Sequence, residues 1–279
     1  MKSKKTTEKA YAKINLFLNV TGLRHDGYHI LSTLMQTVSL YDTVRVKKSR
    51  ELTCKCPGVI SEKNIAYKAV RALENKVGKE LPVEIKIKKR IPSKAGLGGG
   101  SADAAAAVRA VVKLYDVEIS EEDLISVCEE AGADVPFLLF GKTAICEGIG
   151  EVMQYQPSFP KCFIALAKPE EGNSTPQMFK AFDEKGVFSP SLKEKFSSAL
   201  KKGNLKELCA LISNDLTPFD LSGKVKQIKE KFLECGALAS EMSGSGTAVF
   251  AVFEDKKKAK KALRALKKSG LKTFLTVPN

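Results

Sequence analysis

A cluster of glycines lies where a strand pattern gives way to a helix pattern, and this junction constrains the fold more than any other feature. The cluster is Gly96-Leu97-Gly98-Gly99-Gly100, followed by Ser101. Apolar and charged residues alternate over 83–88, which predicts a strand, and the alanine-rich segment 102–115 predicts a helix. Glycine lets the backbone approach a ligand closely, and free N–H groups at a helix N-terminus attract phosphate. Because each glycine loses much backbone entropy on folding, the junction favours phosphate binding over a simple turn.

Two common phosphate-binding patterns do not fit this chain. The pattern GxxxxGK[ST] fails at Gly141-Lys142-Thr143, since it would need a glycine where Pro136 stands. The dinucleotide pattern GxGxxG fails because its last glycine would fall on Ser101. No alternating series of parallel strands and helices surrounds the cluster, so a Rossmann domain is not expected.

Length and charge narrow the class of protein further. With 279 residues the chain has room for two domains of roughly 100–200 residues each, or for one large domain. The 46 Lys and Arg against 32 Asp and Glu give a formal charge of +14. This excess favours anionic partners: nucleic acid, an acidic membrane surface or phosphorylated small molecules. Much of it lies in lysines over 256–268, where a helical apolar stripe makes a solvated helix face the plainer interpretation.

Cysteine usage and short apolar runs indicate a cytoplasmic protein without membrane association. The seven cysteines form no CxxC motif, so reduced thiols are expected. Cys54 and Cys56 offer half of a metal site, but no second cluster supplies other ligands, which favours two strand residues on one face. Apolar runs are far shorter than the ~20 residues that cross a bilayer. Lys2, Lys4 and Lys5 precede no apolar signal core.

Periodicity along the chain predicts mixed helix and sheet. Alternating apolar residues over 12–20 predict a strand whose opposite face carries Lys13 and Asn15. A turn over 22–29 leads to a second strand that reaches about residue 46, so antiparallel sheet is expected. Helices are predicted at 61–76, 102–115, 120–132, from 175, at 192–200, 205–212, 225–235 and in the basic segment, and strands at 143–146, 162–167, 247–253 and 272–277.

A domain boundary is expected near residue 157. Pro157 and Pro160 bracket a short polar stretch without a periodic pattern. We therefore expect an N-terminal domain over 1–157 and a C-terminal domain over 158–279. The order of strands and helices in the second half suggests an α+β sandwich with helices on one face.

Three motifs in order connect the glycine cluster to a known family. They are Ala12-Lys13-Ile14-Asn15-Leu16, the stretch Pro92 to Ala102, and Met242-Ser243-Gly244-Ser245-Gly246-Thr247-Ala248. Together they cover both halves of the chain and resemble motifs of the GHMP kinases, the family of galactokinase, homoserine kinase and mevalonate kinase. The resemblance implies an α+β, two-domain GHMP kinase fold, with an N-terminal ribosomal-protein-S5-domain-2-like domain and a C-terminal ferredoxin-like α/β sandwich domain. It also implies an ATP-dependent kinase of a small molecule.

A narrower match within the family concerns the acceptor. It comprises Arg24-His25-Asp26-Gly27-Tyr28-His29 and Gly132-Ala133-Asp134-Val135-Pro136-Phe137. This match implies a small-molecule substrate that carries a cytidine diphosphate group and is phosphorylated on a hydroxyl. By resemblance, Asp134 is the base for that hydroxyl, and Lys13 orients the base and stabilises developing charge. Without the resemblance, Asp134 is as well explained as a capping or turn residue, and Lys13 as an exposed strand lysine.

The other site residues follow from the same resemblance. ATP is expected to contact Asn64, Pro92, Ala95, Gly96, Leu97, Gly98, Gly99, Gly100 and Ser101. The substrate is expected to contact Asn15, Tyr28, His29, Thr175, Phe179, Ser243 and Gly244. Within that set, His29 recognises the cytosine edge, while Tyr28 and Phe179 stack on the base. Mg²⁺ would bridge the phosphates, with Ser101 as a ligand.

Plainer alternatives remain open for the residues and for the protein. Tyr28 and Phe179 fit core packing, Thr175 fits a helix cap, and Asn64 fits a residue of a first helical turn. A GHMP kinase of the homoserine or mevalonate type would keep the glycine loop without gripping a nucleobase. A basic nucleic-acid-binding protein would use the lysine-rich helix but leaves the loop and Asp134 unexplained. We expect no nucleic-acid partner and a monomer or homodimer.

Overall fold

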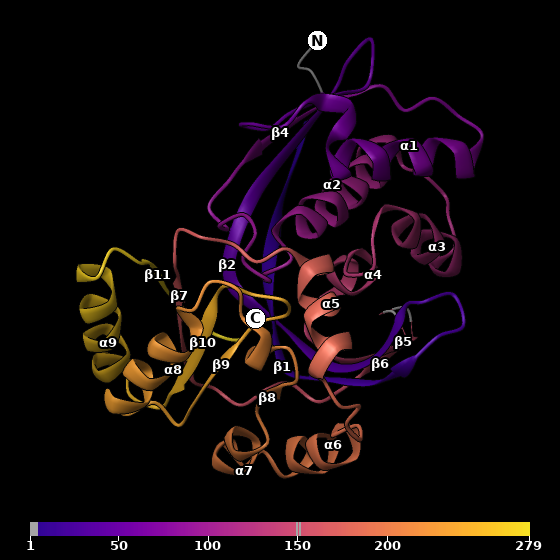
Figure 1. Ribbon diagram of the computed structural model, residues 1–279. Coiled ribbons are helices and arrows are strands. Elements are labelled where there is room, and N and C mark those ends of the chain that lie inside the picture. The colour runs from indigo at the N-terminus through magenta and orange to yellow at the C-terminus, as the bar shows by residue number, and fades with distance from the viewer. Residues whose placement is uncertain (1–4, 149, 151) are drawn as a thin grey trace. The chain divides into compact units, whose positions relative to one another are not determined.

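The computed structural model describes residues 5–148, 150 and 152–279, which form two compact units (Figure 1). The first unit comprises residues up to Ala12, Tyr41–Ile91 and Gly98–Phe140, and the second comprises Lys13–Leu40, Pro92–Leu97 and 141–279. The long strands β1 (Lys5–Leu23) and β2 (His29–Lys48) contribute residues to both units, as does the glycine loop. The contiguous division at residue 157 stays a prediction, and Lys2 and Lys4 lie outside the described residues.

The first unit combines a small sheet with four α-helices. Its elements are β3 (Thr53–Lys55), a 3-10 turn (Ser61–Lys63), α1 (Ile65–Val77), β4 (Val83–Lys88), α2 (Gly99–Tyr115), α3 (Glu121–Ala131) and α4 (Val135–Phe140). The C-terminal part of β2 pairs antiparallel with β4, and β3 runs parallel to β4. Helix α1 packs against α2 and α3. Because α2 buries mainly alanine side chains, neighbouring elements can approach it closely.

Local signals in the sequence explain most of these helices. Asn64 accepts a hydrogen bond from Ala66 N–H at the start of α1, and Ser120 accepts one from Asp123 N–H at the start of α3. Both helices were predicted, and Gly132 ends α3 as expected. Helix α2 begins at Gly99, three residues earlier than the predicted start, so the last two glycines of the cluster belong to its first turn. Helix α4 was not predicted, because six largely apolar residues carry too little periodicity.

The second unit contains a four-stranded antiparallel sheet of the split βαβ type. Its strands are β7 (Phe163–Lys168), β9 (Ala239–Met242), β10 (Val249–Phe253) and β11 (Lys272–Thr276), in the order β11-β7-β10-β9. Helix α8 (Val225–Glu234) precedes β9, and α9 (Lys256–Lys268) connects β10 to β11; both contact this sheet. This connectivity is that of a ferredoxin-like sandwich, as predicted.

The remaining elements of the second unit complete its other sheet and its helices. Strand β5 (Thr143–Gly148) pairs with the N-terminal part of β2, β6 (Val152–Tyr155) pairs with β5, and β8 (Ser213–Asn214) runs parallel to β1. The helices are α5 (Thr175–Lys185), α6 (Lys193–Lys202), α7 (Leu205–Ala210) and a 3-10 turn (Thr217–Phe219). The predicted helix at 205–212 ends earlier, at Ala210, with Leu211 as its C-cap, and β8 follows at Ser213.

The core of the ferredoxin-like part is aromatic and aliphatic. Phe182 of α5, Phe232 of α8 and Phe253 of β10 are buried in one cluster with Ala259 and Leu266 of α9. The lysines of α9 are exposed, whereas Ala259 and Leu266 are buried. The predicted solvated face of this helix is therefore confirmed.

The seven cysteines all carry free thiols. Cys54 is buried in β3, and burial raises the pKa of its thiol to about 12. Cys56 lies just beyond that strand, and its backbone pairs with that of Val59 in an isolated antiparallel β-bridge. Within the described residues there is no group of three or more His, Cys, Asp and Glu side chains that could hold a metal ion. In that same part of the chain, no helix is long and apolar enough to span a bilayer.

Glu84 joins three strands through ion pairs, which makes stability depend on pH. It lies opposite Lys47 in the β2–β4 register and contacts Lys55 Nζ at 2.5 Å and Lys47 Nζ at 3.0 Å. Hydrogen bonds from Lys55 and Lys47 lower the pKa of Glu84 to about 2. We expect Glu84→Gln to lower the free energy of unfolding by about 1 kcal/mol at pH 7.

The difference between Glu84→Gln and the wild type should disappear in acid. A carboxylate whose pKa is lower in the folded state stabilises the fold above the unfolded-state pKa of about 4.3, and this contribution is lost as the pH falls toward 2. Urea unfolding at pH 7, 4 and 2 measures the trend, with Glu80→Gln at an exposed position as control. An equal difference at all three pH values would contradict the assignment.

Candidate active site

The N-terminus of α2 presents backbone donors to a ligand. Gly98 precedes the helix with a left-handed φ of +65°, and no side chain caps the helix end. The first helical hydrogen bond runs from Ala102 N–H to Gly98 O at 2.8 Å. Helix geometry therefore leaves the N–H groups of Gly99, Gly100 and Ser101 without helical acceptors. These donors, together with the helix dipole, make the turn suited to phosphate oxygens.

A buried charge cluster fixes this helix end to the neighbouring strands. Lys89, just beyond β4, contacts Asp42 Oδ2 and Asp103 Oδ2, each at 2.5 Å, and lies 3.4 Å from Gly99 O. Asp42 also accepts a hydrogen bond from Ile91 N–H at 2.8 Å. Burial raises the pKa of Asp103 to about 7, an effect that Lys89 opposes. The cluster thus ties β2, the start of the loop and the first turns of α2 together.

A pocket of about 580 Å³ lies beside β3 and β4 in the first unit. It is lined by Cys54, Lys55, Cys56, Pro57, Val59, Lys86 and Ile87. Asn64 is close to this pocket, because its side chain interacts with the Cys56 thiol as well as capping α1. Asn64 is thus an N-cap residue rather than part of the first helical turn. A flat, partly polar base is the kind of group that such a lining accepts.

Asp134 lies at the start of α4 in the first unit. Its carbonyl accepts a hydrogen bond from Leu138 N–H at 3.1 Å, and its side chain is half-buried. The carboxylate is therefore held at a helix N-terminus with access to solvent. Its role as base stays a prediction.

Lys13 and Asn15 form a buried polar pair on β1 in the second unit. Lys13 is 4% exposed and Asn15 is 2% exposed, so the alternative of an ordinary exposed lysine is wrong. Lys13 Nζ donates to Asn15 Oδ1 at 2.7 Å, and Asn15 Nδ2 donates to Thr33 Oγ1 at 2.9 Å. These contacts fix the amide of Asn15 and hold the ammonium of Lys13. The pairing of Lys13 with Asp134 stays a prediction.

The glycine loop and the Met242–Ala248 motif touch at Gly96. Ser243 Oγ donates to Gly96 O at 2.9 Å and accepts from Asn15 N–H at 3.3 Å. Gly96 has a φ of +71°, and a Cβ there would lie 1.9 Å from Ser243 O. Ala248 N–H donates to Ala95 O at 3.1 Å. The structure therefore brings four predicted site residues, Asn15, Ala95, Gly96 and Ser243, into one network in the second unit.

The turn after β9 is also held by the loop before α5. Asn173 Nδ2 donates to Ser245 O at 2.9 Å, and Thr175 Oγ1 lies 2.7 Å from Ser245 Oγ. Thr175 is the first residue of α5 and Ser174 takes the N-cap position, so the helix-cap alternative for Thr175 is wrong.

His29, Phe179 and Asp183 form a further cluster in the second unit. His29 Nε2 lies 2.7 Å from Asp183 Oδ1, and the His29 and Phe179 rings stack with centroids 4.7 Å apart. Tyr28 is 64% exposed, so core packing does not explain it. Phe179, by contrast, packs partly against the core. The stacked His29 and Phe179 rings, preceded in the sequence by an exposed phenol, suit a planar ligand.

Comparisons with known proteins establish the family. A model described as GHMP kinases N terminal domain matches residues 64–142, and one described as GHMP kinases C terminal matches residues 196–272. Relatives about 40% identical cover nearly the whole chain. The chain belongs to the GHMP kinases, and the two-domain fold expected from the motifs is confirmed.

Individual similar proteins show which members of the family this chain resembles. The 4-diphosphocytidyl-2-C-methyl-D-erythritol kinase of Clostridium botulinum (strain Alaska E43 / Type E3) is 40% identical over 96% of this chain and 98% of its own. That of Desulfitobacterium hafniense (strain Y51) is 41% identical over 90% and 88%. A crystal structure of 4-(cytidine 5'-diphospho)-2C-methyl-D-erythritol kinase matches with a TM-score of 0.81 at 32% identity, covering 98% of this chain and all of that one. Homoserine kinase from Cytophaga hutchinsonii, with a TM-score of 0.79 at 18% identity, covers 100% of this chain and 96% of its own and shows the shared fold alone.

Sequence reasoning missed several residues that support these clusters. Asp183 had a usable signal, because it lies four residues after Phe179 on one helix face. Lys89 stands two residues before Ile91 at the end of a predicted strand, but nothing indicated its two buried partners. Thr33 and Asn173 gave no signal, because their partners come from distant parts of the chain.

Proposed function

We propose that this chain is a 4-diphosphocytidyl-2-C-methyl-D-erythritol kinase of the non-mevalonate isoprenoid pathway. It transfers the γ-phosphoryl group of ATP to the 2-hydroxyl of its cytidine diphosphate substrate. The observation that carries the proposal is the match to relatives of that name at 40% identity over 96% of the chain. The Tyr28, His29 and Phe179 group supports it, because a homoserine or mevalonate kinase needs no grip on a base.

The proposed reaction assigns one task to each group of the site. The substrate hydroxyl oxygen forms a bond to the γ-phosphorus, the bond to the β–γ bridging oxygen breaks, and ADP leaves. Asp134 takes the hydroxyl proton, and Lys13 orients the reacting groups and balances the developing negative charge. The N–H groups at the start of α2 bind ATP phosphates, and Asn64 with its neighbouring pocket receives the adenine.

ATP is the co-substrate expected of this family, and Mg²⁺ is part of the proposal. Mg²⁺ would be bound mainly by the nucleotide phosphates and by the Ser101 hydroxyl in the first turn of α2. This donor set fits an ion that keeps several waters. Bound there, Mg²⁺ would neutralise phosphate charge.

An ADP-release assay tests class and substrate together. The purified protein receives ATP and Mg²⁺ with the diphosphocytidyl substrate, homoserine, mevalonate or galactose in parallel reactions. We expect turnover only with the cytidine compound. Turnover with another acceptor would keep the fold and reject the nucleobase grip. No turnover with any acceptor, together with salt-dependent binding of nucleic acid, would reject the proposal as a whole.

Replacing His29 tests the base-recognition part of the site. We expect His29→Ala to raise the KM for the cytidine substrate about tenfold, because the hydrogen bond between His29 and the cytosine edge is lost. The KM for ATP should stay unchanged. His25→Ala is a matched control, since His25 is exposed in the same loop. Steady-state kinetics measure both KM values for each variant. An unchanged substrate KM would remove His29 from base recognition.

Other expectations about the protein stay predictions. These are the cytoplasmic location, a monomeric or homodimeric state and the absence of a nucleic-acid partner. The Thr175 and Gly244 contacts with substrate belong with them.

A further inference from the structure

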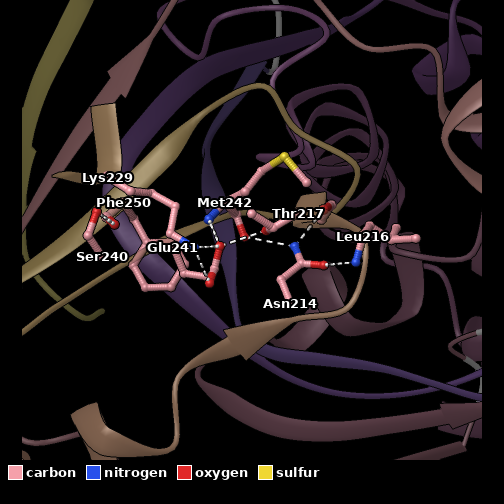
Figure 2. Close-up of polar contacts among 9 residues, drawn as sticks. Asn214, Leu216, Thr217, Lys229, Ser240, Glu241, Met242 and Phe250 are labelled. Atoms are coloured by element: carbon pink, nitrogen blue, oxygen red, sulfur yellow. Dashed lines mark hydrogen bonds and ion pairs between the residues drawn. The ribbon is translucent and has the colours of Figure 1, made fainter. Parts of the chain in front are cut away.

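Asn214 uses its whole amide group to hold the turn that follows β9. Its Nδ2 donates to Met242 O at 2.9 Å, and its Oδ1 accepts from Leu216 N–H at 2.9 Å (Figure 2). The same Nδ2 also donates to Gly244 O at 2.8 Å. The side chain is buried, with the residue 6% exposed. Since two carbonyls require donors and one N–H requires an acceptor, these partners define which end of the amide is nitrogen.

Two rigid supports surround this amide. Asn214 lies in β8, opposite Leu18 of β1, so its backbone is fixed to the strand that carries Lys13 and Asn15. On the other side, Glu241 receives hydrogen bonds from Lys229 Nζ at 2.7 Å and Thr217 Oγ1 at 2.6 Å, and its own carboxylate accepts from Met242 N–H (Figure 2). The amide therefore links two fixed points rather than two mobile loops.

The orientation of the Gly244 carbonyl determines where the next N–H points. In a trans peptide the C=O and the following N–H point in opposite directions, so the bond to Asn214 directs Ser245 N–H away from Asn214. Gly244 and Gly246 both have left-handed φ values, +56° and +84°. Among the described residues, the N–H groups of Gly244 and Ser245 have no hydrogen-bond acceptor, whereas Gly246 N–H donates to Ser243 O. Consecutive unpaired N–H groups in such a turn form an anion-binding concavity.

We propose that Asn214 is a positioning residue that presets the Gly244–Ser245 peptide for the diphosphate of the nucleoside diphosphate substrate. The inference rests on the proposed function, because the occupant of the turn is taken to be the phosphorylated acceptor. Asn214 itself touches no substrate. Its effect is on the direction of N–H groups that phosphate oxygens would accept from.

The test compares cytidine diphosphate with cytidine as probes. Asn214→Asp keeps the shape but removes both donors and places a carboxylate against two carbonyls. We expect its dissociation constant for cytidine diphosphate to rise about tenfold, while that for cytidine stays unchanged, because only the former has phosphates. Asn214→Ala, which adds no charge, serves if the Asp variant does not fold and should show the same selective loss. Calorimetric titration of both ligands gives the two constants.

A matched control variant is available at another asparagine. Asn204 caps α7 and uses only its oxygen, accepting from Lys206 and Glu207 N–H, so Asn204→Asp should leave both constants unchanged. Equal weakening of cytidine and cytidine diphosphate in the Asn214 variants would indicate a general structural role and overturn the inference. Unchanged binding of both would overturn it as well. If the wild type binds neither probe, the proposed function fails, and the inference fails with it.

Discussion

We expect Asp134→Asn to lower turnover by about 10²–10⁴ and to change ATP binding little, as the proposed role of Asp134 as base requires. This is the usual range for removing a general base, since the amide cannot accept the proton of the substrate hydroxyl. The helix-starting hydrogen bond at Asp134 uses its backbone carbonyl, which the Asn variant keeps. Steady-state turnover and nucleotide titration measure the two effects separately.

A matched aspartate distinguishes loss of the base from loss of a charge. Asp116 is exposed in a left-handed conformation after α2, where Asn is equally well tolerated, so Asp116→Asn should have wild-type turnover. Turnover of Asp134→Asn within about threefold of the wild type would remove Asp134 from the role of base.

Gly96→Ala disrupts the contact between the two glycine-rich motifs. A Cβ at this position would lie 1.9 Å from Ser243 O and 3.0 Å from Gly246 N, both backbone atoms, so the turn after β9 must shift. The residue also requires a φ of +71°, which an alanine adopts only at a cost of about 1–2 kcal/mol. We expect turnover to fall by at least about 10², because in the proposed site the displaced N–H groups would no longer meet the substrate.

The strain of a left-handed alanine can be separated from the clash. Gly78 ends α1 at a φ of +62°, and a Cβ there has no heavy atom within 4 Å. Gly78→Ala should therefore show only the cost of a left-handed alanine, a loss of about 1–2 kcal/mol in unfolding free energy. Its turnover should be unchanged. Chemical denaturation and kinetics of both variants provide the comparison. Equal losses of turnover and of unfolding free energy in Gly96→Ala and Gly78→Ala would show that the Gly96–Ser243 contact does not constrain the site.

Local patterns in the sequence were sufficient for much of the fold. The cluster at 96–100 predicted a strand, a loop and a helix in the right order, because glycine and alanine have strong conformational preferences. Alternation over 12–20 correctly placed Lys13 and Asn15 on one face. Alternation does not tell whether that face meets solvent or protein, so the burial of both side chains was not predicted.

The parts of the site that depend on long-range contacts were beyond the sequence. Asn214 shares no motif with Met242 and Gly244, although its amide holds both carbonyls. Lys89 appears in the sequence as one of many lysines, and only the fold brings Asp42 and Asp103 to it. Such contacts are set by packing between distant segments, for which a single sequence carries no periodic signal.

The burial of the native thiols has a practical use in labelling experiments. Burial raises the pKa of Cys54, Cys128, Cys162 and Cys209 to about 12, so almost none of these thiols is ionised at neutral pH. Alkylating reagents attack thiolates, and they need access to the sulfur. A cysteine introduced at the exposed Lys185, at the end of α5, should therefore accept a fluorophore well before these four. Such a probe would report ligand binding at the proposed base site beside Phe179, once the two cysteines that are not buried, Cys56 and Cys235, have been replaced.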